Sequence, residues 1–281
     1  MRITRHITVY RPLVKVIFRY YNYAMAEHEF LGSLGRKIFF LHPPAFIQNQ
    51  VVAELAQEEF EVYVVKDETK LRHVLKKYPD SIVLGCINEG MKENAWADWI
   101  KGIQAAPETS GVEVGVLSLT NDDALRNKYV EQLKVQCGYT VIKFDLAGVV
   151  KQLITILNAV NAKGRRKYIR VIMENETNTT VNLPMKGTFI TSAIKDISVV
   201  GFSCSFAEDP ELTKNSLYGD IQLRLQTQLL KAEGIVFGSR MDGNEKIYVV
   251  LFTQRVDPDV KTRIRKYIQA TLQARIDVEF K

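Results

Sequence analysis

The sequence of 281 residues predicts an α/β domain with a parallel sheet, followed by an antiparallel β-barrel with a terminal helix. Three observations predict this fold class. Short apolar runs alternate with helical patterns over residues 36–161. From residue 162 onward, short strand patterns are separated by frequent turns, and an amphipathic pattern over 258–275 ends the series. The composition, 46% hydrophobic and 25% charged residues, is that of a globular protein and excludes a disordered or collagen-like chain.

The first domain is predicted from five strand patterns that each precede a helical pattern. The strand patterns cover 37–41, 60–65, 81–84, 112–119 and 139–144. The helical patterns cover 45–59, the segment after Asp67, 94–104, 122–136 and 146–160. Asp67 is an expected N-cap, because its carboxylate can accept from the first free amides of a helix. Apolar strands alternating with helices favour a parallel sheet covered on both faces.

The last third is predicted to form a closed or nearly closed barrel. Its strand patterns cover 168–173, 180–183, 188–194, 201–206, 221–230, 234–239 and 247–252. Asp242-Gly243 predicts a hairpin turn between the last two strands. The helix over 258–275 carries one apolar stripe, which consists of Val260, Ile264, Tyr267, Ile268 and Leu272.

Charge is distributed unevenly along the chain, although the total is only +6. Residues 1–24 hold five basic and no acidic residues, 25–161 hold 14 basic and 18 acidic residues, and 162–281 hold 19 basic and 14 acidic residues. The basic, aromatic start is either a membrane-surface or nucleic-acid-binding arm, or a segment outside the working protein, with Met25 as an alternative start. We favour the second interpretation and treat residues 1–35 as an unstructured or misassigned extension.

Several function classes are excluded by what the sequence lacks. Three widely spaced cysteines and four histidines form no disulfide framework and no metal-ligand spacing. No apolar run reaches the ~18 residues that a membrane span needs. We find no nucleophile triad, no paired acid-base carboxylates and no phosphate-binding glycine loop. The sequence therefore predicts a cytoplasmic protein that is not an enzyme and has no cofactor or metal.

Residues 36–161 resemble a response-regulator receiver domain in the order of their elements. Receivers phosphorylate an aspartate at the end of the third strand, where this chain has Cys86, and they hold magnesium on acids after the first strand, where residues 41–44 read Leu-His-Pro-Pro. Lys143 and either Ser118 or Thr120 match other receiver positions. A thiol cannot replace a carboxylate on magnesium. The resemblance therefore implies a silent receiver-like (flavodoxin-like) domain, and Cys86 is expected to have a packing role.

A basic segment stands at the entry to the barrel. Arg165, Arg166 and Arg170 lie between the last helix of the first domain and the first barrel strand. The spacing of Arg166 and Arg170 places both on one face if the segment is extended. A guanidinium pairs bidentately with phosphate and stacks on flat bases, so this segment suits a nucleotide.

A second polar segment lies 25 residues further on. Asp196 and Ser198 share one face of a predicted strand, and Gly201 follows. A carboxylate at this position can accept two hydrogen bonds from the N1 and N2 edge of guanine. The hydroxyl adds a donor, and the glycine lets the backbone turn and approach a ligand.

Together the two segments resemble the signature motifs of the PilZ domain, the bacterial receptor module for cyclic di-GMP. Arg-Arg-x-x-x-Arg is matched by residues 165–170, and Asp-x-Ser-x-x-Gly by residues 196–201, within a resemblance that covers 162–281. It implies that cyclic di-GMP, a dianion, binds to Arg165, Arg166, Arg170, Asp196, Ser198 and Gly201. It also implies a role in motility, surface or virulence control.

The arginines lie at the junction of the two domains, so we hypothesise that ligand binding changes the interdomain geometry and relays the signal to an unidentified protein partner. The alternative is a non-catalytic scaffold whose barrel and acidic domain bind a partner without ligand. Direct nucleic-acid binding is not expected, because the basic region has no helix with interleaved basic and aromatic residues.

Overall fold

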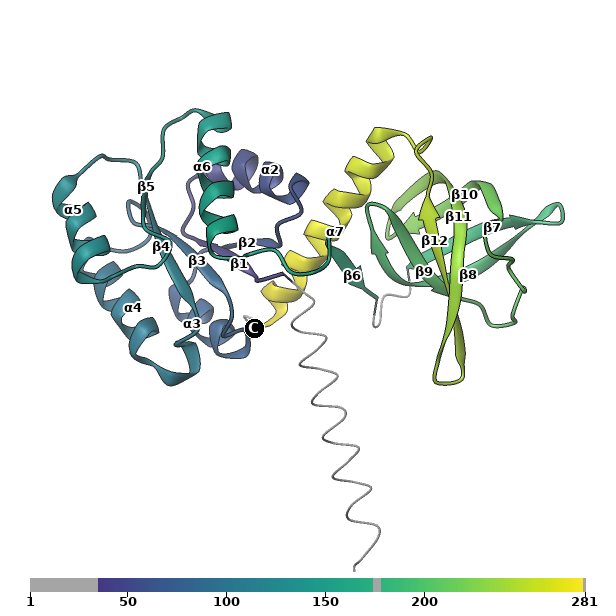
Figure 1. The fold of residues 1–281 in the computed structure, drawn as a ribbon, viewed down its shortest axis with the longest axis horizontal. Coiled ribbons are helices and arrows are strands. Elements are labelled where there is room, and N and C mark those ends of the chain that lie inside the picture. Colours follow the sequence, from purple (N-terminus) through teal and green to yellow (C-terminus); the bar gives the residue numbers. More distant parts are fainter. Residues whose placement is uncertain (1–34, 174–177, 280–281) are drawn as a thin grey trace, which may run out of the picture.

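The computed structural model describes residues 35–173 and 178–279. Figure 1 shows two lobes, an α/β lobe and a β-barrel, with the helix α7 (Pro258–Glu279) between them. The predicted basic extension over 1–35 lies outside the described residues, apart from Gly35. None of the helices in the described ranges has the length and apolar character needed to cross a membrane.

The α/β lobe contains a five-stranded parallel sheet in the order β2-β1-β3-β4-β5. The strands are β1 (Ile38–Leu41), β2 (Val62–Val65), β3 (Ile82–Cys86), β4 (Glu113–Ser118) and β5 (Tyr139–Val141). This is the flavodoxin-like strand order, in which the chain changes direction between β1 and β3. The predicted parallel sheet is confirmed.

Helices cover both faces of this sheet. They are η1 (Ile47–Val51), α2 (Val52–Gln57), α3 (Glu68–Lys77), α4 (Glu93–Ala105), η2 (Pro107–Thr109), α5 (Asp123–Asn127), η3 (Lys128–Gln132) and α6 (Leu146–Ala159). The alternation of β1 shows the two faces: Phe39 packs in one core with α3 and α4, and Phe40 in the other with α2 and α6. Asp67 caps α3 as predicted, since its side chain accepts from the amides of Thr69 and Lys70.

The second lobe is a closed antiparallel barrel of six strands. The barrel strands are β7 (Thr179–Met185), β8 (Thr188–Ser198), β9 (Gly201–Ser205), β10 (Leu217–Leu225), β11 (Gln228–Asp242) and β12 (Glu245–Phe252). Pairing runs β8-β7-β10-β11-β12-β9 and closes between β9 and β8. The short strand β6 (Arg170–Ile172) is added to the last residues of β8. The barrel with a C-terminal helix is therefore confirmed.

Two hairpin turns test the strand bounds that the sequence predicts. The predicted hairpin after Asp242 is present, with Gly243 at a φ of 58°. The single strand expected over 221–230 is wrong, because a hairpin turn divides it into the end of β10 and the start of β11. Gln226 takes a φ of 56° there. Glutamine is not one of the residues that mark a left-handed turn, so the sequence did not signal it.

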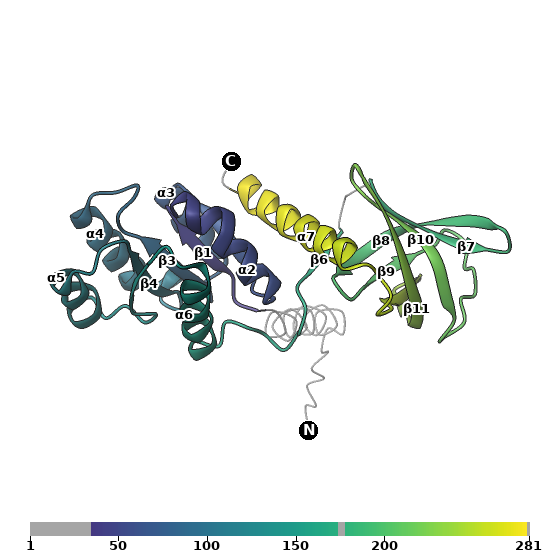
Figure 2. The same ribbon diagram turned by 90° about the horizontal axis from the view of Figure 1, so that it is seen from above.

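The helix α7 belongs to the cores of both lobes. Its first half contributes Ile264, Tyr267 and Ile268 to the barrel core. Its second half continues to Glu279, beyond the predicted end at residue 275, and places Ile276 in the core of the parallel sheet at 3% exposure. Figure 2 shows α7 lying between the α/β lobe and the barrel from a second direction. The two lobes are thus joined by a shared helix as well as by the linker.

The second half of α7 also covers the edge of the sheet. Strand β2 is an outer strand, so alternate peptide groups point away from β1. The Val64 amide donates to Gln273 Oε1 at 2.9 Å, and Gln273 Nε2 donates to the Val64 carbonyl at 3.0 Å. The side-chain amide of Gln273 therefore pairs the backbone N–H and C=O of Val64, which a neighbouring strand would otherwise bind.

Candidate functional site

The pairing of β6 with β8 brings the two polar segments together. Arg170 lies opposite Ser198, and Ile172 lies opposite Asp196. Val171, between the two β6 residues, is fully buried in the barrel core, so Arg170 points outward. The guanidinium Nη1 of Arg170 lies 3.3 Å from Asp196 Oδ1. The arginine and the aspartate that the sequence singled out thus form an ion pair on the outer face of the barrel.

The carboxylate of Asp196 is held from two sides. Ser203, on β9, donates its hydroxyl to Asp196 Oδ2 at 2.5 Å, while Arg170 binds the other oxygen. The Asp196 side chain is 16% exposed and that of Arg170 is 36% exposed. The carboxylate therefore has a fixed position and a partly open side. A purine edge that binds here would donate to the carboxylate oxygens of Asp196, either alongside Ser203 and Arg170 or in place of them.

Ser198 and Gly201 have clear structural roles. The Ser198 hydroxyl is buried and donates to the Gly201 carbonyl at 3.2 Å across the turn between β8 and β9. A Cβ on Gly201 would lie 2.3 Å from the carbonyl oxygen of Val250 on β12, so this glycine is required where the two strands approach. The structure accounts for both residues through strand packing, and the ligand roles expected for them stay predictions.

The remaining arginines lie in the linker before β6. The strand begins only at Arg170, so Arg166 is not on a strand and the expected common strand face does not apply. Arg165 is exposed and Arg166 is partly buried. Burial lowers the pKa of the Arg166 guanidinium, Arg170 lowers it further, and Asp196 acts in the opposite direction. Arg166 and Arg170 line one small hollow, so the two guanidinium groups can act on one anion.

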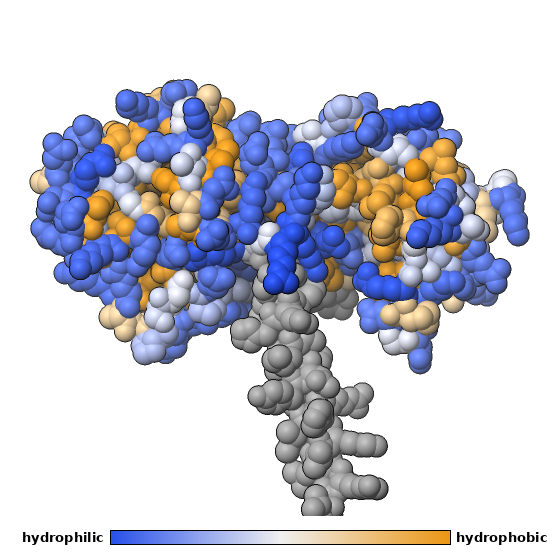
Figure 3. Space-filling model, in the orientation of Figure 1, coloured by the Kyte–Doolittle hydropathy of each residue, from blue (hydrophilic) through white to orange (hydrophobic). Residues whose placement is uncertain are grey.

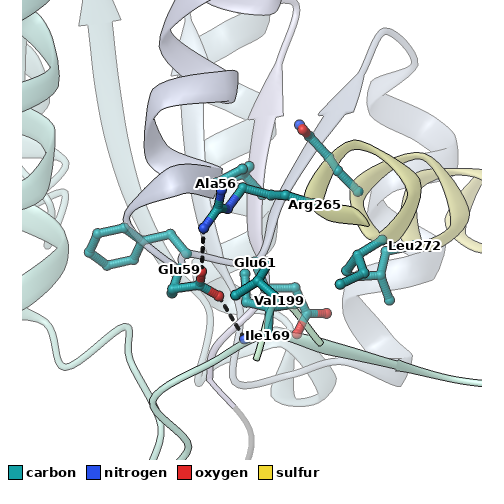
Figure 4. A pocket seen from close by; sticks show the side chains of 11 residues that line it. Ala56, Glu59, Glu61, Ile169, Val199, Arg265 and Leu272 are labelled. Carbon is teal, nitrogen blue, oxygen red and sulfur yellow. Dashed lines mark hydrogen bonds and ion pairs between the residues drawn. The ribbon is translucent and has the colours of Figure 1, made fainter. Parts of the chain in front are cut away.

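One charged residue near the arginine segment that the sequence did not single out is Glu59. It follows α2 with a φ of 61° and lies against the linker. Glu59 Oε2 accepts from the Ile169 amide at 2.9 Å, and Oε1 accepts from Arg265 Nη2 of α7 at 3.2 Å. Figure 4 shows these contacts in a pocket between the lobes that Val199 and Leu272 also line. A glutamate at the end of a helix gave no sequence signal for this contact.

The carboxyl edge of the parallel sheet is where a receiver would carry its chemistry. Cys86 ends β3 at 4% exposure, and burial raises the pKa of its thiol above the ordinary range. The Ser118 hydroxyl donates to the Thr120 carbonyl at 3.0 Å, and Lys143 is exposed beyond β5. In the described ranges, no group of three or more His, Cys, Asp or Glu side chains is placed to hold a metal ion. These contacts favour packing over reactivity for Cys86, as expected.

Solved structures of PilZ domains are similar to part of the chain. The PilZ domain of YcgR from Escherichia coli, solved with c-di-GMP, is 15% identical with a TM-score of 0.33, and the match covers 40% of this chain and 93% of that one. The MrkH–c-di-GMP complex from K. pneumonia is 20% identical with a TM-score of 0.36, covering 41% of this chain and 56% of that one. The Bacillus subtilis inhibitor of motility, MotI, is 15% identical with a TM-score of 0.33, covering 38% and 50%.

The match spans about half the length of MrkH and MotI. Comparison with family models and with curated proteins found no match.

Proposed function

We propose that this protein is a non-catalytic receptor for cyclic di-GMP. The observation that carries the proposal is the ion pair of Arg170 and Asp196 on the outer face of the barrel, with Arg166 in the hollow that Arg170 also lines. These are the residues of the two sequence motifs, and they come from segments 26 residues apart. Two cations and one carboxylate at a partly open surface suit a ligand that carries both phosphates and guanine edges.

The roles of the residues follow from their chemistry. Arg166 and Arg170 bind phosphate oxygens or stack on guanine, and the exposed Arg165 closes over the ligand from the linker. Asp196 accepts from the N1 and N2 edge of guanine. Ser198 and Gly201 keep β8 and β9 in register beneath it, in addition to the ligand contacts that the motif implies.

Calorimetry with cyclic di-GMP tests this proposal. We expect binding by the wild type and a loss of roughly 10- to 100-fold in Arg166→Ala and in Asp196→Asn, because a hydrogen bond to a charged group contributes about 1.5–3 kcal/mol. Arg240→Ala removes the same charge from an exposed position on β11 and serves as the control. The absence of binding by a folded wild-type protein would overturn the proposal.

The signal is relayed, we infer, through a change in the arrangement of the two lobes. The arginine segment is the linker between them, so a ligand that attaches it to the barrel restricts the junction. Any change must also act on α7, because its two halves lie in different cores. Small-angle scattering with and without cyclic di-GMP tests the relay, and identical profiles at saturation would contradict it.

A partner protein is the expected recipient of this signal, in motility, surface or virulence control and in the cytoplasm. One observation favours the alternative of a ligand-independent scaffold: the barrel has an apolar outer face. Leu217, Ile235 and Leu251 lie opposite one another on β10, β11 and β12, and each is more than a third exposed. Figure 3 shows apolar side chains gathered on this lobe. A pull-down in which cyclic di-GMP changes neither the partner nor its amount would favour the scaffold.

A further inference from the structure

The turn between α2 and β2 holds both ends of the arginine segment. At one end, Lys163 Nζ lies 4.5 Å from the ring centroid of Phe60. At the other end, the Ile169 amide donates to Glu59 at 2.9 Å. Residues 164–168, which include Arg165 and Arg166, therefore form a loop that is anchored at both ends to consecutive residues of the α/β lobe, Glu59 and Phe60.

Glu59 also reaches a third element, the helix α7. Its side chain is 13% exposed, and its two oxygens bind the linker and α7 separately. Arg265 supplies a counter-charge that is itself 25% exposed. One carboxylate thus connects the α/β lobe, the arginine segment and the terminal helix.

The same carboxylate lies beside the proposed ligand site. Glu59 and Glu61 line one small hollow together with Arg166, Arg170 and Tyr168. Each carboxylate has one cation partner, Lys37 for Glu61 and Arg265 for Glu59, but Glu59 also binds the linker amide of Ile169. A phosphate bound by Arg166 and Arg170 would meet the charge of Glu59 across this hollow. Like charges a few ångströms apart repel appreciably where water is partly excluded.

We propose that Glu59 sets the affinity of the receptor by fastening the arginine segment to the α/β lobe and opposing the anionic ligand there. In this proposal, which rests on the proposed function, the attachment of the segment by Glu59 weakens anion binding. This effect is reciprocal, because a contact that weakens ligand binding is itself weakened when the ligand binds. Glu59 is therefore a positioning residue through which the α/β lobe responds to the ligand.

Titration of Glu59→Gln with cyclic di-GMP tests the opposition. The substitution keeps the shape and one of the two acceptor oxygens, replaces the other oxygen by an NH2 group that cannot accept, and removes the charge. We expect roughly 5-fold tighter binding than in the wild type, with a smaller gain at high salt. Glu58→Gln removes the same charge from the preceding, exposed residue and should change the affinity by less than about 2-fold, since exposed charges are screened. Unchanged or weaker binding by Glu59→Gln would overturn the proposal.

Trypsin cleavage without ligand tests the fastening on its own. Glu59→Ala removes both hydrogen bonds, so cleavage after Lys163, Arg165, Arg166 or Lys167 should be several-fold faster than in the wild type and in Glu58→Ala. Equal rates in all three proteins would contradict the fastening. If neither the wild type nor any of the variants binds cyclic di-GMP, the proposed function and the effect of Glu59 on affinity are both wrong. The cleavage rates still decide whether Glu59 holds the segment.

Discussion

The carboxyl edge of the parallel sheet and the outer face of the barrel both carry polar residues at positions where the resemblances seen in the sequence imply a site. At the sheet edge, Cys86 is buried and the Ser118 hydroxyl is bound to the neighbouring backbone. On the barrel, Arg170 and Asp196 converge at a partly open surface. The two regions differ in that charged side chains converge at an open surface on the barrel, whereas the corresponding groups at the sheet edge are buried or bound to the backbone.

The largest expected effect tests whether the sheet edge can accept a charged group. Cys86→Asp places a carboxylate in a position that is 4% exposed, and we expect it to destabilise the protein by about 3 kcal/mol at pH 7. Burial raises the folded-state pKa of such a carboxyl above its unfolded value, so the loss should be smaller near pH 4, where the group is neutral. Urea unfolding at both pH values measures this.

Cys86→Ala is the control for that experiment, because it removes the thiol without adding charge. Unchanged stability of Cys86→Asp, together with magnesium-dependent phosphorylation by a small phosphodonor, would show that the sheet edge can act as a phosphorylation site.

The second effect compares a cation from each region. Arg170→Ala should weaken cyclic di-GMP binding by about 2 kcal/mol, roughly 30-fold, because it removes a guanidinium that also orients Asp196. Lys143→Ala removes a cation from the sheet edge and should leave the affinity unchanged. An equal loss of cyclic di-GMP affinity in both variants would mean that the ligand does not bind specifically at the barrel face.

A smaller effect concerns the helix that joins the two regions. Gln273→Ala removes two hydrogen bonds from the edge of β2 and should lower the free energy of unfolding by about 1–2 kcal/mol. Gln254→Ala, at an exposed turn, is the control and should have almost no effect. Hydrogen exchange at the Val64 amide should be faster in Gln273→Ala alone, and equal exchange in both variants would mean that water replaces the glutamine without cost.

The smallest expected effect is the slow alkylation of all three cysteines in the folded protein. Burial raises the pKa of Cys86 above the ordinary range and the pKa of Cys137 and Cys204 to about 12. The thiolate is the reactive form, so iodoacetamide should label the native protein slowly at pH 8 and rapidly in urea. Fast labelling of Cys86 in the native protein would show a reactive thiol at the sheet edge.

The sequence was sufficient for the elements whose pattern is local. Apolar runs such as Ile38–Leu41 predicted buried parallel strands, and Asp67 predicted a helix cap. The two motifs were recognised from their residue types and spacing, whereas the contact between Arg170 and Asp196 depends on the pairing of β6 with β8. The turn at Gln226 was missed because its backbone conformation depends on the strands around it and not on its own residue type.

The contacts between the lobes were beyond sequence reasoning for a different reason. Glu59 meets Ile169 and Arg265 across separations of 110 and 206 residues. Nothing in the local pattern of a glutamate after a helix predicts such partners. In the sequence, Gln273 is only a polar residue on the side of a helix. Its hydrogen bonds to the backbone of Val64 form only when α7 packs against the α/β lobe.

The capping of β2 by α7 has a consequence for the order in which the protein is made. The edge of β2 is translated 209 residues before the glutamine that covers it. During synthesis the α/β lobe can complete its sheet while one edge still offers unpaired peptide groups, and such edges attract other strands. The barrel must emerge before the cap is available. Protection of the nascent chain against aggregation is therefore greatest only after the ribosome has finished the final helix.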